Sequence, residues 1–379
     1  MKIGIITIHN SPNYGASLQA FALWKYLTDS GYDCEVIDLH RPHQEDYIPS
    51  KKYMPCRYNK DSFKTKIKKQ IYRLLKRQTC KYLTKEARRK FDAFNSQIRF
   101  SRSFLSVDEL YSNPPVYDVY ITGSDQLWNP TQPFCIEPYF LTFAPKGKRK
   151  ISYSSSIGIT ELKEKEKELF RKALVQYDAI SVREFQAKQL LQHLIAKEIV
   201  QVADPTFLLP LETWNCISIK PNASEKYLLL FTLGFNKPLL EYAIHLGNQS
   251  RLRVVYLTAV QPEDNGQYQA VVDAGPREWI GYISNAEMVI TDSFHGTVFS
   301  IIMGTNNFFT YISPTNQRGS RITDLLDTFG LINHLLKTNL QQTYSELSAT
   351  TISHKQIAEI IQKEREQSQN FLIRNIHYK

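Results

Sequence analysis

Short apolar runs alternate with longer segments of helical periodicity along most of this 379-residue chain. The short runs predict strands, and the segments between them, where apolar residues recur about every three or four positions, predict helices. The predicted strands of the first half are KIGIITI, CEVIDL, VYDVYITG, KISYSSSIG, AISV and IVQV, and those of the second half are YLLLFTLG, VVYLT, QAVVDA, MVIT and FFTYI. This alternation is typical of parallel sheets with helices on both faces, so we expect an α/β fold.

The pattern starts afresh in the second half, which indicates two Rossmann-like domains facing a cleft. We place the first domain at residues 1–205, with a basic helical insertion at about 57–100, and the second at residues 206–345. Residues 346–379 form a C-terminal helix and tail. The helical pattern from about His354 to Phe371 is far in sequence from the second sheet, and such a helix could cross back to the first domain.

The positive charge of the chain is concentrated in one segment. The net charge is +10, and the segment Arg57–Lys90 holds about fourteen basic residues against two acids, so it accounts for the whole excess. The positive charge is therefore a property of this segment and not of the whole surface. We expect no nucleic-acid partner.

Within this segment the apolar positions form one helical stripe, made of Phe63, Ile67, Ile71, Leu74 and Leu75. One interpretation is a helix over residues 60–90 that lies on an anionic membrane surface, which would suit a lipid-linked acceptor. The alternative is an ordinary surface helix that packs its stripe on the first domain.

Cysteine usage and hydropathy indicate a cytoplasmic protein. The five cysteines are scattered without a C-x-x-C pair, which argues against a disulfide framework and a cysteine zinc site. No apolar run, KIGIITI included, reaches the length of a membrane-spanning helix. We therefore expect a soluble protein, or one that is peripheral on the inner face of the membrane.

Two loops that follow predicted strands of the first half carry polar residues. The first contains Asn13, Tyr14 and Gly15; Gly15 permits close backbone approach, and the following helix offers N–H groups to an anion. It lacks G-x-G-x-x-G and G-K-S/T, and turn chemistry explains Asn13 and Gly15 equally well.

The second loop contains Ser124, Asp125 and Gln126, directly after a buried strand. The Asp125 carboxylate could act as a base or orient a hydroxyl, or it could simply cap a helix.

Arg183 ends the apolar strand AISV, where an unpaired guanidinium would be costly. We therefore expect it to meet a carboxylate, either from the chain itself or from a ligand.

The stretch Asp292–Gly296 lies at a strand-to-helix junction, and ligands bind at the carboxyl ends of strands in layered α/β proteins. Ser293 is expected to be the N-cap of a helix, which puts His295 in its first turn. The positive end of the helix disfavours a second proton on the imidazole, so a neutral His295 could accept a proton near pH 7. The alternative is a structural histidine.

Taken in order, the motifs GSDQLWN, ISYSSSIG, SVRE, ADPTFLL and DSFHGTVFSIIMG resemble the polysaccharide pyruvyl transferase family, and the similarity covers roughly residues 3 to 335. The resemblance implies a fold like that of the GT-B glycosyltransferases. It also implies transfer of pyruvate from phosphoenolpyruvate to sugar hydroxyls, usually as a cyclic ketal, without a metal or other cofactor.

Matching the family's motifs assigns roles to particular residues. His295 matches the catalytic histidine, and Arg183 matches an arginine that holds the donor. Many members read Arg-Leu-His where this chain has Ser293-Phe294-His295, so another cation must replace the missing arginine. We expect Arg321, or Arg318 just before it, to do so; the alternative is that Arg321 begins a helix and pairs with Asp324 or Asp327.

The complete prediction is a pyruvyl transferase of surface polysaccharide, exopolysaccharide or capsule biosynthesis, with a saccharide acceptor on the first domain and phosphoenolpyruvate on the second. The predicted catalytic residues are His295 and Asp125, the donor-binding residues are Arg183, Arg321, Arg318, Ser293, Phe294 and Gly296, and the acceptor or cleft residues are Asn13, Tyr14, Gly15, Ser124, Gln126 and Ser156.

Two rival functions stay open. A nucleotide-sugar glycosyltransferase would need a ribose-binding carboxylate and a base-stacking residue, for which Glu278 and Trp279 are candidates. The presence of Ser293 in place of arginine also suits a non-catalytic saccharide-binding relative.

Overall fold

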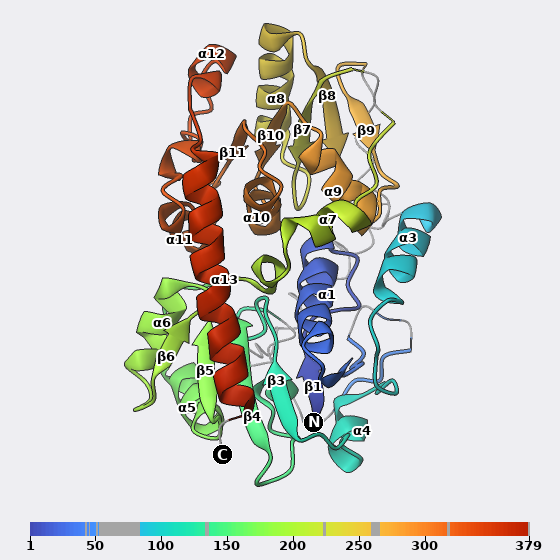
Figure 1. The fold of residues 1–379 in the computed structure, drawn as a ribbon, viewed down its shortest axis with the longest axis vertical. Coiled ribbons are helices and arrows are strands. Elements are labelled where there is room, and N and C mark those ends of the chain that lie inside the picture. Colours follow the sequence, from blue (N-terminus) through green and yellow to red (C-terminus); the bar gives the residue numbers. More distant parts are fainter. Residues whose placement is uncertain are drawn as a thin grey trace, which may run out of the picture. The chain divides into compact units, whose positions relative to one another are not determined.

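Two parallel sheets form the framework of the protein (Figure 1). The computed structural model describes residues 1–41, 44, 46–50, 52, 84–132, 136–222, 225–258, 266–316 and 319–377. These divide into two compact units, one within Met1–Tyr58, Asn95–Pro210 and Glu359–Lys379, the other within Asn59–Phe94 and Leu211–Ala358.

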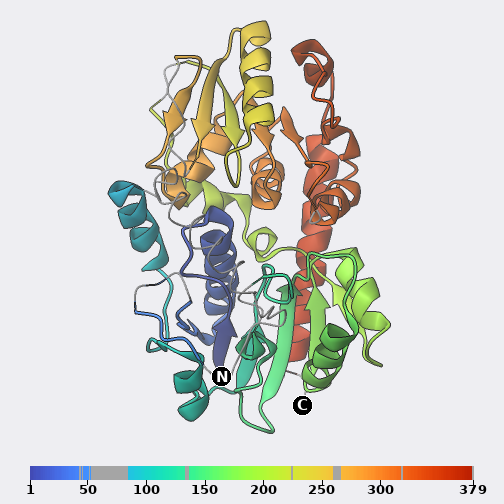
Figure 2. The same cartoon turned by 180° about the vertical axis from the view of Figure 1, so that it is seen from behind.

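The first unit contains a six-stranded sheet in the order β2-β1-β3-β4-β5-β6, and every neighbouring pair is parallel. Its strands are β1 (Lys2–Ile6), β2 (Asp33–Val36), β3 (Val119–Thr122), β4 (Arg149–Ser155), β5 (Ala179–Val182) and β6 (Ile199–Gln201). Its helices are α1 (Tyr14–Asp29), α4 (Val107–Ser112), η1 (Glu137–Phe140), α5 (Glu164–Leu174), α6 (Phe185–Gln192) and η2 (Pro205–Leu208). Figure 2 shows α5 and α6, in green, beside β5 and β6.

The second unit contains a five-stranded parallel sheet in the order β11-β10-β7-β8-β9. Its strands are β7 (Tyr227–Phe231), β8 (Arg253–Leu257), β9 (Gln269–Val271), β10 (Met288–Thr291) and β11 (Phe308–Thr310). Its helices are α7 (Leu211–Ile217), α8 (Lys237–Ser250), α9 (Pro276–Ser284), α10 (Phe294–Ile302), α11 (Ser320–Thr328), η3 (Ile332–His334) and α12 (Tyr344–Ser348).

The predicted α/β class with two parallel sheets is confirmed, and every predicted strand forms. The final helix, α13 (His354–His377), also behaves as predicted, because its residues from Glu359 onward belong to the first unit. There Ser368 accepts a hydrogen bond from the Ala203 backbone at 3.0 Å, and Arg365 donates to the Phe207 carbonyl at 2.8 Å. Helix α13 therefore holds the chain on both sides of Asp204.

Helix α3 (Lys85–Asn95), at the end of the basic segment, packs within the second unit. Phe91 and Phe94 are buried, and Lys90 forms an ion pair with Glu278 at 3.1 Å. The sequence predicts that this stretch belongs to the first domain, whereas Lys85–Phe94 belong to the second unit. Periodicity identifies an apolar face but not the surface that covers it.

The apolar stripe Phe63–Leu75 lies outside the described residues. Among the described residues, no helix combines the length and the apolarity needed to cross a membrane.

Candidate active site

The loops that follow four neighbouring strands of the first sheet meet in a buried polar network. Arg183, just after β5, donates through Nη1 to Asp204 Oδ2 at 2.8 Å and to Ser124 Oγ at 3.4 Å. The side chains of Arg183 and Asp204 are only 3% and 1% exposed. The predicted carboxylate partner of Arg183 is therefore supplied by the chain, in the motif ADPTFLL.

Electrostatics favour the charged form of this arginine. Burial opposes the charge of Arg183, but the carboxylates of Asp204 and Glu184 outweigh that effect and raise the pKa of Arg183 above its usual value. Asp125 acts in the same direction. Because a buried pair of this kind strongly penalises loss of either partner, we expect it to fix the geometry of the surrounding loops.

Glu184, the next residue, organises the loop after β4. Its Oε1 accepts hydrogen bonds from Ser156 Oγ at 2.8 Å and from the backbone N–H groups of Ile157 and Gly158, both at 2.9 Å. The two charged residues of SVRE thus stabilise different loops. Arg183 contacts the loops after β3 and β6, and Glu184 contacts the loop after β4.

Asp125, in the loop after β3, has a left-handed backbone, as does Ser154 near the end of β4. The φ of Asp125 is 76°, in the left-handed region that residues other than glycine seldom adopt. Its carbonyl accepts from the Ser156 N–H at 2.9 Å, and its carboxylate accepts from the Gln126 N–H at 2.8 Å. Strain of this kind is held by its surroundings and is frequent at functional sites. Asp125 is half-buried, whereas Ser124 and Gln126 are buried beside it.

The loop after β1 has cap chemistry, as one of the two interpretations predicts. Asn13 is the N-cap of α1 and accepts from the Ala16 N–H at 3.2 Å. Tyr14 and Gly15 form the buried first turn of that helix.

A histidine–aspartate pair that no motif of the sequence indicates lies beside this loop. His9 Nε2 is 2.9 Å from Asp38 Oδ1. Burial favours a higher pKa for Asp38, but hydrogen bonds from His9 and Ser103 outweigh it and hold the pKa below its usual value.

In the second unit, the loop after β10 leads into α10 in the predicted way. Ser293 is the N-cap, and its Oγ accepts from the Gly296 N–H at 3.3 Å. His295 lies in the first turn and is largely buried. Gly296 is required by packing, because a Cβ at this position would be 2.5 Å from Thr291 Oγ1.

Phe294 links His295 to Arg321. Its ring is edge-on to the His295 imidazole, with centroids 5.2 Å apart, and the Arg321 Cζ lies 5.5 Å from the centroid of the Phe294 ring. Arg321, in the first turn of α11, is therefore brought to the same edge as His295. Arg318, the other candidate, lies outside the described residues.

Asp292 connects this edge to the loop after β7. Its Oδ1 accepts from the Leu233 N–H at 2.9 Å, and its Oδ2 accepts from Asn236 Nδ2 at 3.2 Å. Burial raises the pKa of Asp292 above its usual value, although these hydrogen bonds oppose the rise.

Comparison with known proteins identifies the family of the chain. The family model described as polysaccharide pyruvyl transferase matches residues 13–314. The chain belongs to the polysaccharide pyruvyl transferase family. A search of curated proteins finds no significant match.

Solved structures show what this family member shares in fold. The glycotransferase of kitacinnamycin matches with a TM-score of 0.53 at 10% identity, covering 99% of both chains. The UDP-GlcNAc 2-epimerase of Methanocaldococcus jannaschii, in complex with UDP-GlcNAc and UDP, matches with a TM-score of 0.50 at 12% identity, covering 96% of this chain and 99% of that chain. At these identities the likeness concerns the fold alone, which is GT-B-like, as predicted.

The residues proposed for a nucleotide-sugar function do not suit that role in this pyruvyl transferase relative. Trp279 is 0% exposed and packs edge-on against Phe231 and Phe299. A ring sealed in the core cannot stack on a ligand. Glu278 is engaged by Lys90 and by the Gly275 N–H, to which it is bonded at 3.2 Å.

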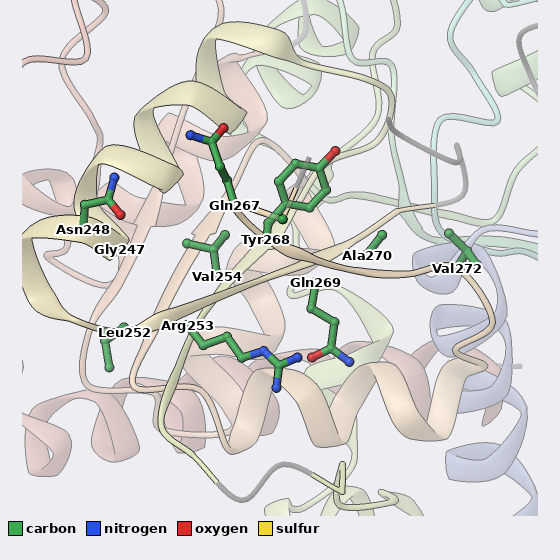
Figure 3. Close-up of a pocket in the computed structure, with 11 residues that line it drawn as sticks. Gly247, Asn248, Leu252, Arg253, Val254, Gln267, Tyr268, Gln269, Ala270 and Val272 are labelled. Atoms are coloured by element: carbon green, nitrogen blue, oxygen red, sulfur yellow. The ribbon is translucent and has the colours of Figure 1, made fainter. Parts of the chain in front are cut away.

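A cavity of about 660 Å³ opens in the second unit beside β8 and β9 (Figure 3). Asn248, Arg253, Gln267 and Gln269 are among its polar lining residues. Figure 3 shows Arg253 and Gln269 pointing to one side of the strands and Asn248 to the other. The described lining includes none of the predicted site residues, so the family motifs do not build this cavity.

Proposed function

We propose that this family member transfers pyruvate from phosphoenolpyruvate onto hydroxyls of a saccharide and forms a ketal, in the biosynthesis of a surface polysaccharide or exopolysaccharide. The observation that carries this proposal is the position of His295 in the first turn of α10, with Arg321 across the Phe294 ring.

The edge around His295 suits the donor. Phosphoenolpyruvate carries a phosphate and a carboxylate, which are bound by guanidinium groups and by the N-terminal ends of helices. Arg321 supplies the cation, and the start of α10, formed by Ser293, Phe294 and Gly296, supplies the helix end. In this proposal Arg321 takes the place of the arginine that many family members have at the position of Ser293.

The edge of the first sheet suits the acceptor better than the donor. Asp125, Glu184 and Asp204 are three carboxylates around the one guanidinium of Arg183. This surplus of negative charge disfavours a dianion but tolerates neutral sugar hydroxyls. We therefore assign Arg183 a bracing role here, although the family resemblance implies a donor contact. Ser124, Gln126, Ser156 and the turn Asn13–Gly15 complete this acceptor side.

The proposed reaction assigns one proton transfer to each edge. His295 and Asp125 are the two proton-transfer groups, one as proton donor and the other as proton acceptor. A proton from the donor adds to C3 of phosphoenolpyruvate, which makes C2 an oxocarbenium-like centre. A sugar hydroxyl bonds to C2 and gives its proton to the acceptor. The bond between C2 and the phosphate oxygen breaks, phosphate leaves, and a second hydroxyl closes the ketal with loss of its proton. General acid and base groups of this type each contribute about a hundredfold or more to such a reaction.

A transfer assay tests this function. The full-length protein is incubated with phosphoenolpyruvate and a panel of bacterial saccharides, and products are followed by mass spectrometry together with phosphate release. We expect a saccharide that gains one pyruvate with loss of one water, in step with phosphate. Transfer of a sugar from a nucleotide sugar, without use of phosphoenolpyruvate, would contradict the proposal.

A lipid-linked acceptor and a peripheral position on the inner membrane face are proposed on the basic segment at residues 60–90 alone. Co-sedimentation with anionic vesicles at low and high salt tests both, because surface binding of this kind weakens as salt increases. Absence of binding at low salt would rule out the membrane contact.

A further inference from the structure

The loop between β7 and α8 exposes two large apolar side chains. Leu233 is 60% exposed and Phe235 is 55% exposed, whereas the five residues of the preceding strand β7 are all buried. Gly234 separates the two, and a Cβ added there would meet nothing within 4 Å. The loop therefore exposes an apolar surface that a ligand or partner could contact.

This surface is held in place by hydrogen bonds on both sides. Asp292 accepts from the Leu233 N–H at 2.9 Å and from Asn236 Nδ2 at 3.2 Å. Asn236 in turn caps α8 by accepting from the Leu239 N–H at 3.3 Å. A fixed apolar surface loses little conformational entropy on binding, which favours a recognition role.

The same bonds place the loop beside the proposed donor edge. Asp292 directly precedes Ser293, the N-cap of the helix whose first turn contains His295. A hydroxyl that attacks the donor must come within bonding distance of it, so an acceptor has to contact the surface around His295.

We propose that Leu233 and Phe235 form a platform on which a sugar ring of the saccharide acceptor stacks; this inference rests on the proposed function. The faces of a pyranose ring carry C–H groups that pack against aromatic and aliphatic side chains, while its hydroxyls point outward to polar partners. The donor offers little such surface, because phosphoenolpyruvate is a small dianion. Phe235 and Leu233 thus contribute to acceptor affinity and not to donor affinity.

Steady-state kinetics of pyruvate transfer separate the two substrates. We expect Phe235→Ala to raise the KM for the saccharide about tenfold, with the KM for phosphoenolpyruvate unchanged. Phe235→Trp should keep acceptor affinity, and Leu233→Ala should have a smaller effect than Phe235→Ala. The matched control is Ile332→Ala, which removes a side chain that is 51% exposed on η3 of the same unit and should change neither KM.

Several outcomes would overturn the platform. An unchanged saccharide KM in Phe235→Ala, or an equal rise in both KM values, would remove it while leaving the proposed function intact. Loss of a dimer in sedimentation of Phe235→Ala would assign the surface to a second copy of the chain, and loss of vesicle binding would assign it to lipid. If the unaltered protein transfers no pyruvate, the proposed function itself fails, and the platform fails with it.

Discussion

The carboxyl edges of the two sheets are built from the same kind of element, a strand followed by a loop and a helix, but their chemistry is opposite. The first edge gathers Asp125, Glu184 and Asp204 around one buried arginine, and most of their oxygens accept hydrogen bonds from neighbouring loops. The second edge presents His295 and Arg321 around the start of α10.

This difference in charged side chains explains how two sheets of similar architecture can bind different substrates. At the first edge the charged side chains interact mainly with one another. Their network therefore fixes the geometry of the loops, and the remaining hydrogen-bonding groups can bind a neutral ligand. At the second edge a helix start and a guanidinium favour an anion. A donor that is a dianion and an acceptor that is a polyol match these two environments.

The largest expected effect comes from breaking the first edge. Asp204→Ala leaves the Arg183 guanidinium, which is 3% exposed, without its closest carboxylate. Removing one partner of a buried pair costs about 3–5 kcal/mol, so we expect a loss of this size in the free energy of unfolding by urea. Asp29→Ala, which breaks the surface pair with Lys25 in the same unit, is the control and should cost less than about 1 kcal/mol. Equal losses in the two variants would show that the network is not structural.

The next largest effect concerns the second edge, where we expect loss of turnover rather than of folding. His295→Ala should lower kcat for pyruvate transfer at least about a hundredfold, because it removes one of the two proposed proton-transfer groups. His354→Ala, an exposed histidine of the second unit that is hydrogen-bonded to Asn306, should leave kcat unchanged. Near-normal turnover of the His295 variant would exclude His295 from the mechanism.

A smaller effect concerns the stability contribution of His334, a buried histidine of the second unit. Burial lowers the pKa of His334, whose Nδ1–H donates to the Phe308 carbonyl at 2.7 Å. In the unfolded chain His334 binds a proton below about pH 6.5, whereas in the folded protein it stays neutral to lower pH. The free energy of unfolding therefore decreases as the pH is lowered below about 6.5. The slope is at most about 1.4 kcal/mol per pH unit for this one proton.

Urea unfolding between pH 7.5 and 5 measures this effect. His334→Asn, which keeps an N–H donor but does not titrate, should flatten the curve, whereas His245→Asn on the exposed face of α8 should not. A curve that keeps its slope in His334→Asn would place the titration elsewhere.

Much of the framework could be predicted from sequence, because strand-forming runs and helix starts are local. The position of Ser293 between an apolar strand and a helix predicts an N-cap, and the structure confirms it. The need of Arg183 for a carboxylate was also predictable, since burial follows from the strand before it.

What escaped prediction depends on contacts between distant segments. Asp204 lies 21 residues from Arg183, and nothing local marks it as the partner. Trp279 is a candidate stacking residue by residue type alone, but Phe231 and Phe299 pack against its ring in the core. The left-handed backbone of Asp125 likewise results from its bonds to the loop after β4, which the local sequence does not reveal.

Calorimetric titration with phosphoenolpyruvate tests most directly where the donor binds. We predict that Arg321→Gln weakens binding at least about tenfold, because it removes the cation beside His295, while Asp125→Asn leaves binding unchanged or slightly tighter. Asparagine tolerates the left-handed backbone at position 125, so that variant changes charge with little change in shape. Weaker binding in Asp125→Asn together with normal binding in Arg321→Gln would place the donor at the first edge and contradict the account.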